Sequence, residues 1–274
     1  MKKVFPIVII SFLLLPLLIL MSSCYRNPVT GRTSLSLVDD GTVVSMANQQ
    51  YSTFLTANPP VQGTAGTEMV KRVGVRMATA VREYLASSGQ AGLINGYNWE
   101  FNLVNNAEAN AWCLPGGKVV VYSGILPYTV TETGLAVVMG HEIAHAIARH
   151  GNERMSQALA QQYGGAALSA VVSTRPAEMQ TVFNTAYGVT STLGALAYSR
   201  KQEYEADEMG LYFMAMAGYN PTEATEFWGR MAARGGARPP EFLSTHPGND
   251  DRISHIRTLL PKAMRYYNKQ PQTK

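Results

Sequence analysis

The chain has 274 residues, of which 46% are hydrophobic and 15% are charged. Such a composition suits one globular domain with a large core and excludes an intrinsically disordered chain. The net charge is only +4, and no dense cluster of lysine and arginine is present, so the sequence predicts no nucleic-acid partner.

The first 23 residues have the pattern of a secretory signal peptide. Lys2 and Lys3 form a basic start, and an almost unbroken apolar run extends from Val4 to Met21. Small residues precede Cys24, so the leader resembles that of a bacterial lipoprotein, in which the mature chain begins with a lipid-carrying cysteine. The alternative is an uncleaved transmembrane anchor, because the run is about long enough to span a bilayer.

We therefore expect a lipidated Cys24 and a tether over residues 24–38, followed by a single folded domain over residues 39–274. Either kind of leader places this domain on the periplasmic side of the cell envelope. Tyr25 stands where an aspartate would retain a lipoprotein in the inner membrane, so we expect an outer-membrane location. The other cysteine, Cys113, is expected to be a small, buried, apolar side chain.

The first half of the chain predicts helices beside a small sheet. Helical periodicity is present over residues 40–57 and 65–88. Alternating polarity predicts a strand over residues 97–104. A β-branched run predicts another over residues 118–122, after a tight turn at 115–117.

The second half of the chain is mostly helical by its pattern. One long helix is predicted over residues 131–150, closed by Gly151, and it is buried because apolar residues surround it. The segment 155–198 is poor in charge and broken at Pro176. It predicts either a membrane-facing or oligomer-forming helix pair or, as we favour, ordinary close packing of small residues. Further helices are predicted over residues 203–217, from Asn220-Pro221, and over residues 250–264.

The stretch His141-Glu142-Ile143-Ala144-His145 carries the strongest chemical signal. Two histidines four apart on a helix present both imidazoles on one face, at the spacing that lets two nitrogens bind one zinc ion. Glu142 projects beside that face, where it can take a proton from a water molecule at the metal. The pattern predicts a zinc metalloprotease site with one Zn²⁺ per chain.

A catalytic zinc site needs a third protein ligand and an open fourth position. The spacing used by metzincins would place the third histidine at Gly151 and the turn glycine at Ala148, so His150 is not expected to be this ligand. A positive charge near the end of a helix accounts for His150 instead.

A distant carboxylate is the other option for the third ligand. Glu203 and Asp207 lie one turn apart on one predicted helix face, and Glu205 points away from both. One of the pair can bind zinc while the other accepts the N–H of a zinc-binding histidine. The alternative is an exposed acidic helix start that the helix dipole stabilises.

Several segments together resemble peptidase family M48, a group that includes lipoprotein and membrane proteases of the bacterial envelope. The matching segments are His141 to His145, Ser199 to Asp207, Asn110-Ala111 with Leu114 to Gly117, Ser244 to Pro247 with Arg252-Ile253, and the Asn27 to Arg32 stretch. The resemblance implies a mostly helical, gluzincin-like α+β fold with a small sheet flanking the cleft. It also implies Glu203 as the third ligand, supported by Asp207.

The same resemblance implies roles in catalysis. Glu142 acts as general base, and His246 and Arg252 are candidates for stabilising the oxyanion. A turn residue and a surface ion pair are the alternatives for these two residues. His246 has a further possible role as a fourth zinc ligand that closes the site at rest.

Residues 118–122 are expected to form an edge strand beside the cleft, to which an extended substrate adds through main-chain hydrogen bonds. This hypothesis assigns substrate binding to the following residues: Asn110, Lys118, Val119, Val120 and Val121.

The sequence thus predicts a zinc endopeptidase that acts on unfolded or misassembled envelope proteins and binds the membrane through a lipid on Cys24. The alternative is a latent or non-catalytic, chaperone-like zinc lipoprotein whose site is closed by His246.

Overall fold

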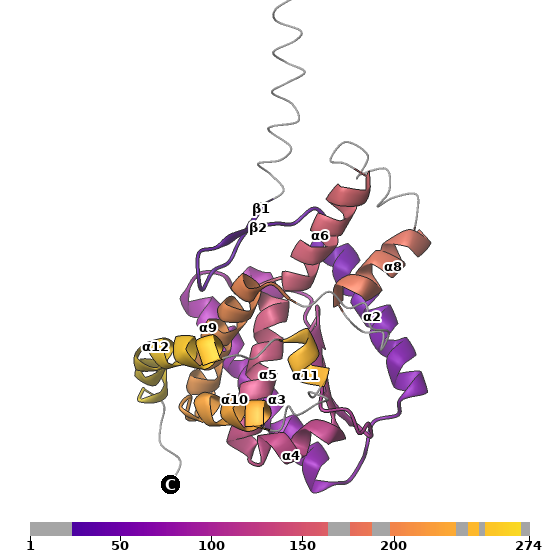
Figure 1. Ribbon diagram of the computed structural model, residues 1–274. Helices are drawn as coiled ribbons and strands as arrows, with labels where there is room; N and C mark the ends of the chain where they lie inside the picture. The colour runs from indigo at the N-terminus through magenta and orange to yellow at the C-terminus, as the bar shows by residue number, and fades with distance from the viewer. Residues whose placement is uncertain (1–23, 164–175, 188–197, 234–240, 247–249, 270–274) are drawn as a thin grey trace, which may run out of the picture.

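The computed structural model describes residues 24–163, 176–187, 198–233, 241–246 and 250–269. Helix α5 (Glu132–Ile147) runs through the middle of the molecule, between a group of helices on one side and a small sheet on the other (Figure 1). This arrangement confirms the predicted α+β class with mostly helices. The predicted signal peptide lies outside the described residues. Within the described part of the chain, no helix has the length and hydrophobicity needed to cross a membrane.

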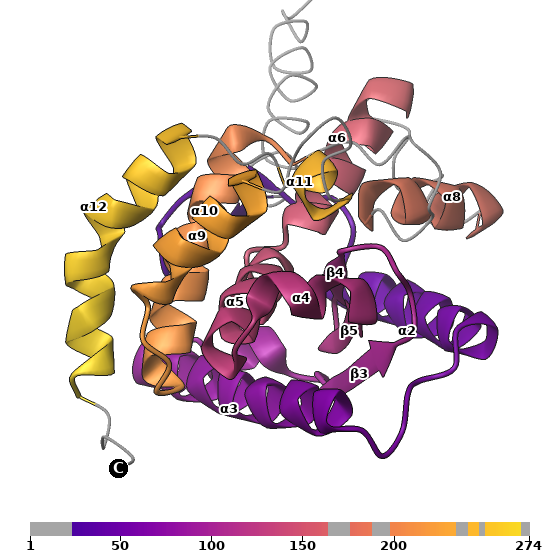
Figure 2. The same cartoon turned by 60° about the horizontal axis from the view of Figure 1, so that its bottom comes forward.

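The other helices surround α5. They are α2 (Asp40–Ala57), α3 (Ala65–Ser87), α4 (Leu126–Thr129), α6 (His150–Tyr163), α8 (Pro176–Tyr187), α9 (Arg200–Met216), α10 (Glu223–Ala233), α11 (Glu241–Thr245) and α12 (Asp250–Tyr267), with short 3-10 turns η1 (Ala91–Ile94) and η2 (Ser123–Ile125). Helix α9 packs along α5, α12 packs against α9, and α3 contacts both α5 and α9 (Figures 1 and 2). Helices α6 and α8 pack against each other through Met155, Leu159, Met179 and Phe183, which favours the close-packing interpretation of this segment.

The long helix predicted over residues 131–150 is in fact two helices. Thr131 caps the start of α5 by accepting a hydrogen bond from the Gly134 N–H, and α5 ends at Ile147. Arg149 then adopts a positive φ of 59°, which turns the chain into α6. Gly151 lies inside α6, where a Cβ atom would come within 2.1 Å of the Tyr187 ring. The glycine therefore permits close packing and does not end the helix.

Two glycines bring α5 and α9 close together. A Cβ atom at Gly210 on α9 would lie 3.0 Å from the carbonyl carbon of Gly140 and 3.0 Å from the backbone nitrogen of His141. Because the obstructing atoms belong to the backbone, they cannot rotate out of the way. This contact sets the distance between the two helices that carry the predicted metal ligands.

Replacing Gly210 by alanine is therefore expected to lower the free energy of unfolding by about 1–3 kcal/mol, the usual range for overpacking. The matched control is Gly229→Ala in α10, where a Cβ atom meets nothing within 4 Å. There, alanine is expected to raise the free energy of unfolding by about 0.5–1 kcal/mol, because it favours the helix. Urea unfolding of the two variants measures both values. Equal stabilisation by the two alanines would contradict this account of the helix contact.

The sheet has three strands, in the order β3-β5-β4. Strand β5 (Lys118–Tyr122) pairs in parallel with β3 (Glu100–Val104) and antiparallel with β4 (Ala111–Leu114). The prediction of an edge strand at residues 118–122 is therefore wrong, since β5 lies in the centre. The predicted first strand is shorter than expected, and β4 was not predicted. Gly116 and Gly117, both with φ of 82°, make the tight turn that joins β4 to β5.

The segment after Cys24 is folded against the domain. Strands β1 (Cys24–Arg26) and β2 (Thr33–Leu35) form a short antiparallel hairpin. The Tyr25 hydroxyl donates a hydrogen bond to the carbonyl of Ile147 at 3.0 Å, and the Asn27 amide contacts the Met209 sulfur at 3.2 Å. Most of the segment expected to act as a tether is thus packed on α5 and α9. Cys24 is exposed, and Cys113 is buried as predicted.

Candidate active site

Four side chains from three parts of the fold converge at one buried point. They are His141 and His145 on α5, Glu203 on α9, and His246, which follows α11. The Nε2 atoms of His141 and His145 are 3.0 Å apart, and His246 Nδ1 is 3.1 Å from His141 Nε2. Glu203 Oε1 lies 3.0 Å from His246 Nδ1 and 3.4 Å from His145 Nε2. The structure thus brings together the three predicted ligands and the predicted fourth.

The spacing of these atoms fits a single zinc ion. Ligands bound at about 2.0–2.1 Å in a tetrahedron are about 3.3 Å from one another. Four of the separations, at 3.0–3.4 Å, are close to this value, and all four ligand atoms lie within 4.8 Å of one another. Burial would raise the pKa of Glu203, but His246 and Arg252 outweigh it and hold that pKa well below its usual range. A carboxylate and several imidazole nitrogens therefore face one point, an arrangement that a cation stabilises.

Asp207 and Arg252 contact His141 and Glu203 and fix the orientation of these two side chains. Asp207 Oδ1 lies 3.0 Å from His141 Nδ1, so His141 can donate its N–H there and direct its other nitrogen at the metal position. Arg252 donates two hydrogen bonds to the Asp207 carboxylate, at 2.7 and 2.6 Å, and lies 2.9 Å from Glu203 Oε2. The guanidinium also stacks on Trp228, 3.6 Å from the ring centre.

These contacts change the interpretation of Arg252. It is only 1% exposed, and its donors face the two carboxylates. The structure therefore does not support the expected role in stabilising an oxyanion. Arg252 is instead a positioning residue that fixes Asp207 and Glu203.

His145 is held by a second chain of contacts, through His150. The two Nδ1 atoms are 2.8 Å apart, and His150 Nε2 lies 2.9 Å from Glu205 Oε2. When His145 Nε2 binds a metal, its Nδ1–H donates to His150 Nδ1, and the Nε2–H of His150 donates to Glu205. Glu205 also accepts hydrogen bonds from Thr30 and Arg32 in the N-terminal hairpin loop.

The prediction that His150 acts as a cation near a helix end is therefore wrong. His150 is fully buried, and this burial lowers its pKa, so the ring is kept neutral as its acceptor role requires. Glu205 does point away from the metal ligands, as expected, but it completes this chain. The chain of hydrogen bonds from His145 through His150 to Glu205 could not be found from spacing alone. It continues from Glu205 to Thr30 and Arg32, in a loop more than 100 residues earlier.

The Glu205→Gln variant is expected to weaken zinc binding by about tenfold, because outer hydrogen-bond partners orient a ligating histidine. Competition with a zinc-binding chromophore measures the affinity. The matched control is Glu153→Gln. Glu153 accepts two hydrogen bonds from the same Arg32, each at 2.8 Å, but unlike Glu205 it has no hydrogen bond with His150 among the described residues. If both variants weaken zinc binding equally, the effect comes from the stability of the hairpin and not from His145.

Glu142 lies beside the ligands, in a narrow cleft. Burial raises the pKa of Glu142 to about 7, which suits a group that must accept and return a proton near neutral pH. Its Oε1 atom accepts no hydrogen bond from any residue that the structure describes, and His246 Nε2 lies 3.4 Å away. The other residues that line the cleft come from β4, α6, α8 and the segments beside α9 and α11: Asn110, Ala111, Trp112, Cys113, Arg154, Tyr187, Tyr198, Thr245 and His246.

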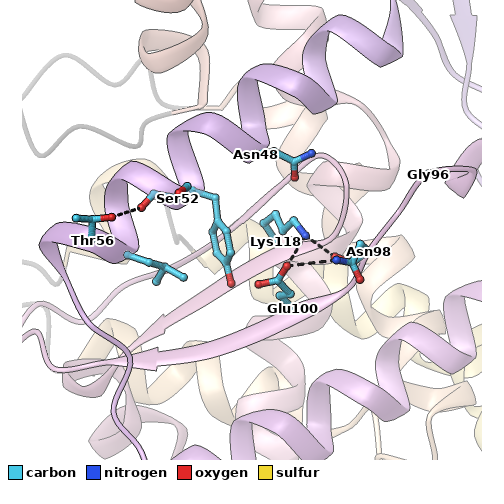
Figure 3. Close-up of a pocket in the computed structure, with 9 residues that line it drawn as sticks. Asn48, Ser52, Thr56, Gly96, Asn98, Glu100 and Lys118 are labelled. Carbon is cyan, nitrogen blue, oxygen red and sulfur yellow. Dashed lines mark hydrogen bonds and ion pairs between the residues drawn. The ribbon is translucent and has the colours of Figure 1, made fainter.

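The prediction that residues of β5 bind the substrate is not supported by the structure. Both edges of β5 are paired with neighbouring strands, so Val119, Val120 and Val121 cannot pair with a further strand. Lys118 lines a different cavity, against α2, which shares no lining residue with the cleft (Figure 3). There its ammonium group binds the Glu100 carboxylate at 2.6 Å and the Asn98 carbonyl at 2.7 Å (Figure 3).

Strand β4, and not β5, is the edge strand beside the cleft. It is the edge strand on the α5 side of the sheet, and its first three residues line the cleft. Asn110, the residue before β4, also lines the cleft as expected, and its side chain accepts a hydrogen bond from the Ala111 N–H at 2.9 Å.

Sequence reasoning missed several cleft residues, among them Tyr198, Arg154 and Tyr187. The Tyr198 ring stacks on His145 at 3.9 Å and on His246 at 5.3 Å, and the Arg154 guanidinium lies 4.2 Å from the Tyr198 ring centre. Their only signal in the sequence was that an aromatic and a basic residue stand in or beside the segment 155–198, which is otherwise poor in charge.

Comparison with known proteins agrees with this site. Residues 68–260 match the model of peptidase family M48. The mitochondrial metalloendopeptidase OMA1 of Saccharomyces cerevisiae is 36% identical over 88% of this chain and 70% of its own length. OMA1 of Schizosaccharomyces pombe is 35% identical over 68% of this chain and 53% of its own length. The beta-barrel assembly-enhancing protease of Escherichia coli K12 is 26% identical over 84% of this chain.

The chain spans about half the length of the last two relatives, 53% and 46% respectively. The Saccharomyces cerevisiae and E. coli proteins nevertheless cover 88% and 84% of this chain, and the residues that match the family model include all four converging side chains. The chain therefore belongs to peptidase family M48 and is a zinc metalloendopeptidase.

Proposed function

We propose that this metalloendopeptidase faces the periplasm of a bacterial cell envelope and hydrolyses unfolded or misassembled envelope proteins. One relative is named a beta-barrel assembly-enhancing protease and comes from Escherichia coli, whereas others are mitochondrial. The pattern of residues 1–23 and the exposed Cys24 favour the bacterial envelope and attachment through a lipid.

One observation carries the hydrolytic mechanism. Glu142 is buried beside the metal ligands, and its Oε1 atom accepts no hydrogen bond from any described residue, with His246 Nε2 3.4 Å away, so this oxygen is available to a reacting water molecule. When bound, zinc acidifies water and polarises a carbonyl group. Glu142 takes the proton as the water attacks the peptide carbonyl, and it then delivers this proton to the leaving amine.

Strand β4 is the element that would hold the substrate. An extended polypeptide can add to its free edge by main-chain hydrogen bonds, which demand little of the side chains. Such binding requires an unfolded segment, because a folded protein has already paired its backbone groups. This requirement is the physical basis for proposing unfolded or misassembled substrates.

His246 supports a second proposal, that the enzyme has a latent resting form. Its Nδ1 atom lies 3.0 Å from Glu203 Oε1 and 3.1 Å from His141 Nε2, where a fourth zinc ligand belongs. Helix α11, which precedes His246, is tied to the segment before β4 by a hydrogen bond from Phe242 N–H to the Ala109 carbonyl at 3.0 Å. His246 must leave this position before a substrate carbonyl can reach it.

The proposed substrate class can be tested with one outer-membrane protein in two states. The purified protein from Tyr25 onward is incubated with the substrate as an unfolded chain and as the folded, detergent-bound form. We expect cleavage of the unfolded chain alone, and its loss on adding a zinc chelator. Equal cleavage of both states would contradict substrate binding through an added strand.

Lipid attachment is tested separately, by growing cells with radiolabelled palmitate. We expect label in the wild-type protein and none in Cys24→Ser, with Cys113→Ser as the control that retains it. Label in the Cys24→Ser variant would refute this anchor. The result does not depend on whether the enzyme is active.

A further inference from the structure

Two buried polar groups in the cleft have no hydrogen-bond partner among the residues that the structure describes. Arg154 Nε and Tyr187 Oη are inaccessible to solvent and make no hydrogen bond to any described residue. Both side chains line the same cleft as Glu142, although they come from different helices, α6 and α8. The mechanism of hydrolysis makes no use of either group.

The Arg154 guanidinium also has no counter-ion among the described side chains. It is 7% exposed, and its one hydrogen bond to a described residue goes to the Thr185 carbonyl, at 3.2 Å. No carboxylate in the described part of the chain lies within 4 Å of its nitrogens. The other buried arginine of the site, Arg252, has Asp207 and Glu203 as partners. Buried arginines are almost always paired, because an uncompensated buried charge is costly.

We propose that Arg154 and Tyr187 form a subsite that binds a carboxylate of the polypeptide substrate. Arginine provides a planar set of donors that matches a carboxylate, and a tyrosine hydroxyl adds a further donor. Tyr198 holds the guanidinium by stacking, at 4.2 Å from its ring centre. The inference rests on the proposed binding of the substrate in this cleft.

The carboxylate has two possible sources in a polypeptide. One is the side chain of an aspartate or glutamate at a fixed distance from the cleaved bond. The other is the C-terminal carboxylate, which would make the enzyme prefer bonds near the end of a chain. A hydrogen bond to a charged group favours the acidic ligand over its neutral amide by about tenfold or more.

Binding to the Glu142→Gln variant tests the subsite without turnover. The probes are alanine-rich decapeptides labelled with fluorescein at the N-terminus, with one aspartate at each position in turn. Matched sets carry asparagine in place of aspartate, and each peptide has either a free or an amidated C-terminus. Fluorescence anisotropy is expected to show about tenfold tighter binding for aspartate at one position, or for the free C-terminus.

Variants of the subsite identify the group responsible. Adding Arg154→Met is expected to abolish the preference for the acidic peptide, and Arg154→Lys is expected to retain part of it. Tyr187→Phe removes only the hydroxyl and is expected to reduce the preference severalfold. The control is Arg149→Met, which removes a nearby positive charge that pairs with Asp40 outside the cleft. Thermal unfolding identifies any variant that has simply lost its fold.

The possible outcomes separate this inference from the proposed function. Equal binding of aspartate and asparagine peptides, and of free and amidated ends, overturns the carboxylate subsite alone. A preference that survives in Arg154→Met also overturns it. If no peptide binds although the wild-type enzyme cleaves unfolded protein, both the subsite and the assignment of this cleft to the substrate are wrong.

Discussion

Replacing Glu142 by glutamine is expected to reduce the hydrolysis of unfolded casein by about a thousandfold, while zinc stays bound. A positioned general base contributes about 10²–10⁴-fold to proton transfer. Glutamine keeps the shape of the side chain but cannot take the proton from the attacking water. The metal ligands His141, His145 and Glu203 are untouched.

The measurement combines fluorescent-casein cleavage with the zinc content of the same purified sample. Unchanged zinc content with lost cleavage identifies Glu142 as the proton carrier. The control is Glu208→Gln on α9, whose carboxylate binds Tyr212 and Lys262 away from the metal ligands. Equal cleavage by wild type and Glu142→Gln would refute the proposed mechanism.

The His246→Ala variant is expected to cleave casein about tenfold faster than wild type at saturating zinc. His246 Nδ1 lies 3.1 Å from His141 Nε2 and 3.0 Å from Glu203 Oε1, and under the proposed latent form only molecules in which His246 has moved away can bind a substrate. Removing the imidazole makes every molecule competent, and a competent state populated at about one tenth gives this gain. The same change removes a ligand, so zinc binding is expected to weaken.

Initial rates of casein cleavage and a chelator competition give the two quantities. Ser244→Ala is the matched control, because Ser244 is exposed on α11 two residues earlier. The opposite result is also informative. A zinc-loaded His246→Ala enzyme without activity would show that His246 stabilises the transition state and does not act as an inhibitory ligand.

The parts of the site that follow from local spacing could be predicted from the sequence. His141 and His145 are four residues apart on a helix, so their convergence depends only on helical geometry. Glu203 and Asp207 share a face for the same reason, although their assignment to the metal came from a family resemblance. The strong periodicity of residues 65–88 likewise predicted α3 within one residue at its C-terminal end.

The parts that failed depend on contacts between distant segments. Gly151 resembled a helix end, but its lack of a side chain serves the packing of Tyr187. The real break is at Arg149, whose positive φ has no signal in the sequence. Strand β4 has only four residues and is buried throughout, so it has no alternating pattern to detect.

The position of β4 also explains why the substrate edge was misplaced. The β-branched residues of β5 give the strongest strand signal, and such residues favour the interior of a sheet as well as its edges. Only the strand order distinguishes the two cases. Arg252 was misjudged for a similar reason, because its carboxylate partners Asp207 and Glu203 lie more than 40 residues away.

The folded hairpin after Cys24 determines how far an anchored enzyme can work. A free linker over residues 25–36 could extend about 40 Å and let the peptidase sweep a wide volume. Because Tyr25 and Asn27 are packed on α5 and α9, the segment cannot extend in this way. Under the proposed lipid attachment, the enzyme would stay at the membrane surface with its cleft at a nearly constant height. It would then select its targets by location, and a polypeptide stalled at the surface would be cut before one diffusing in the periplasm.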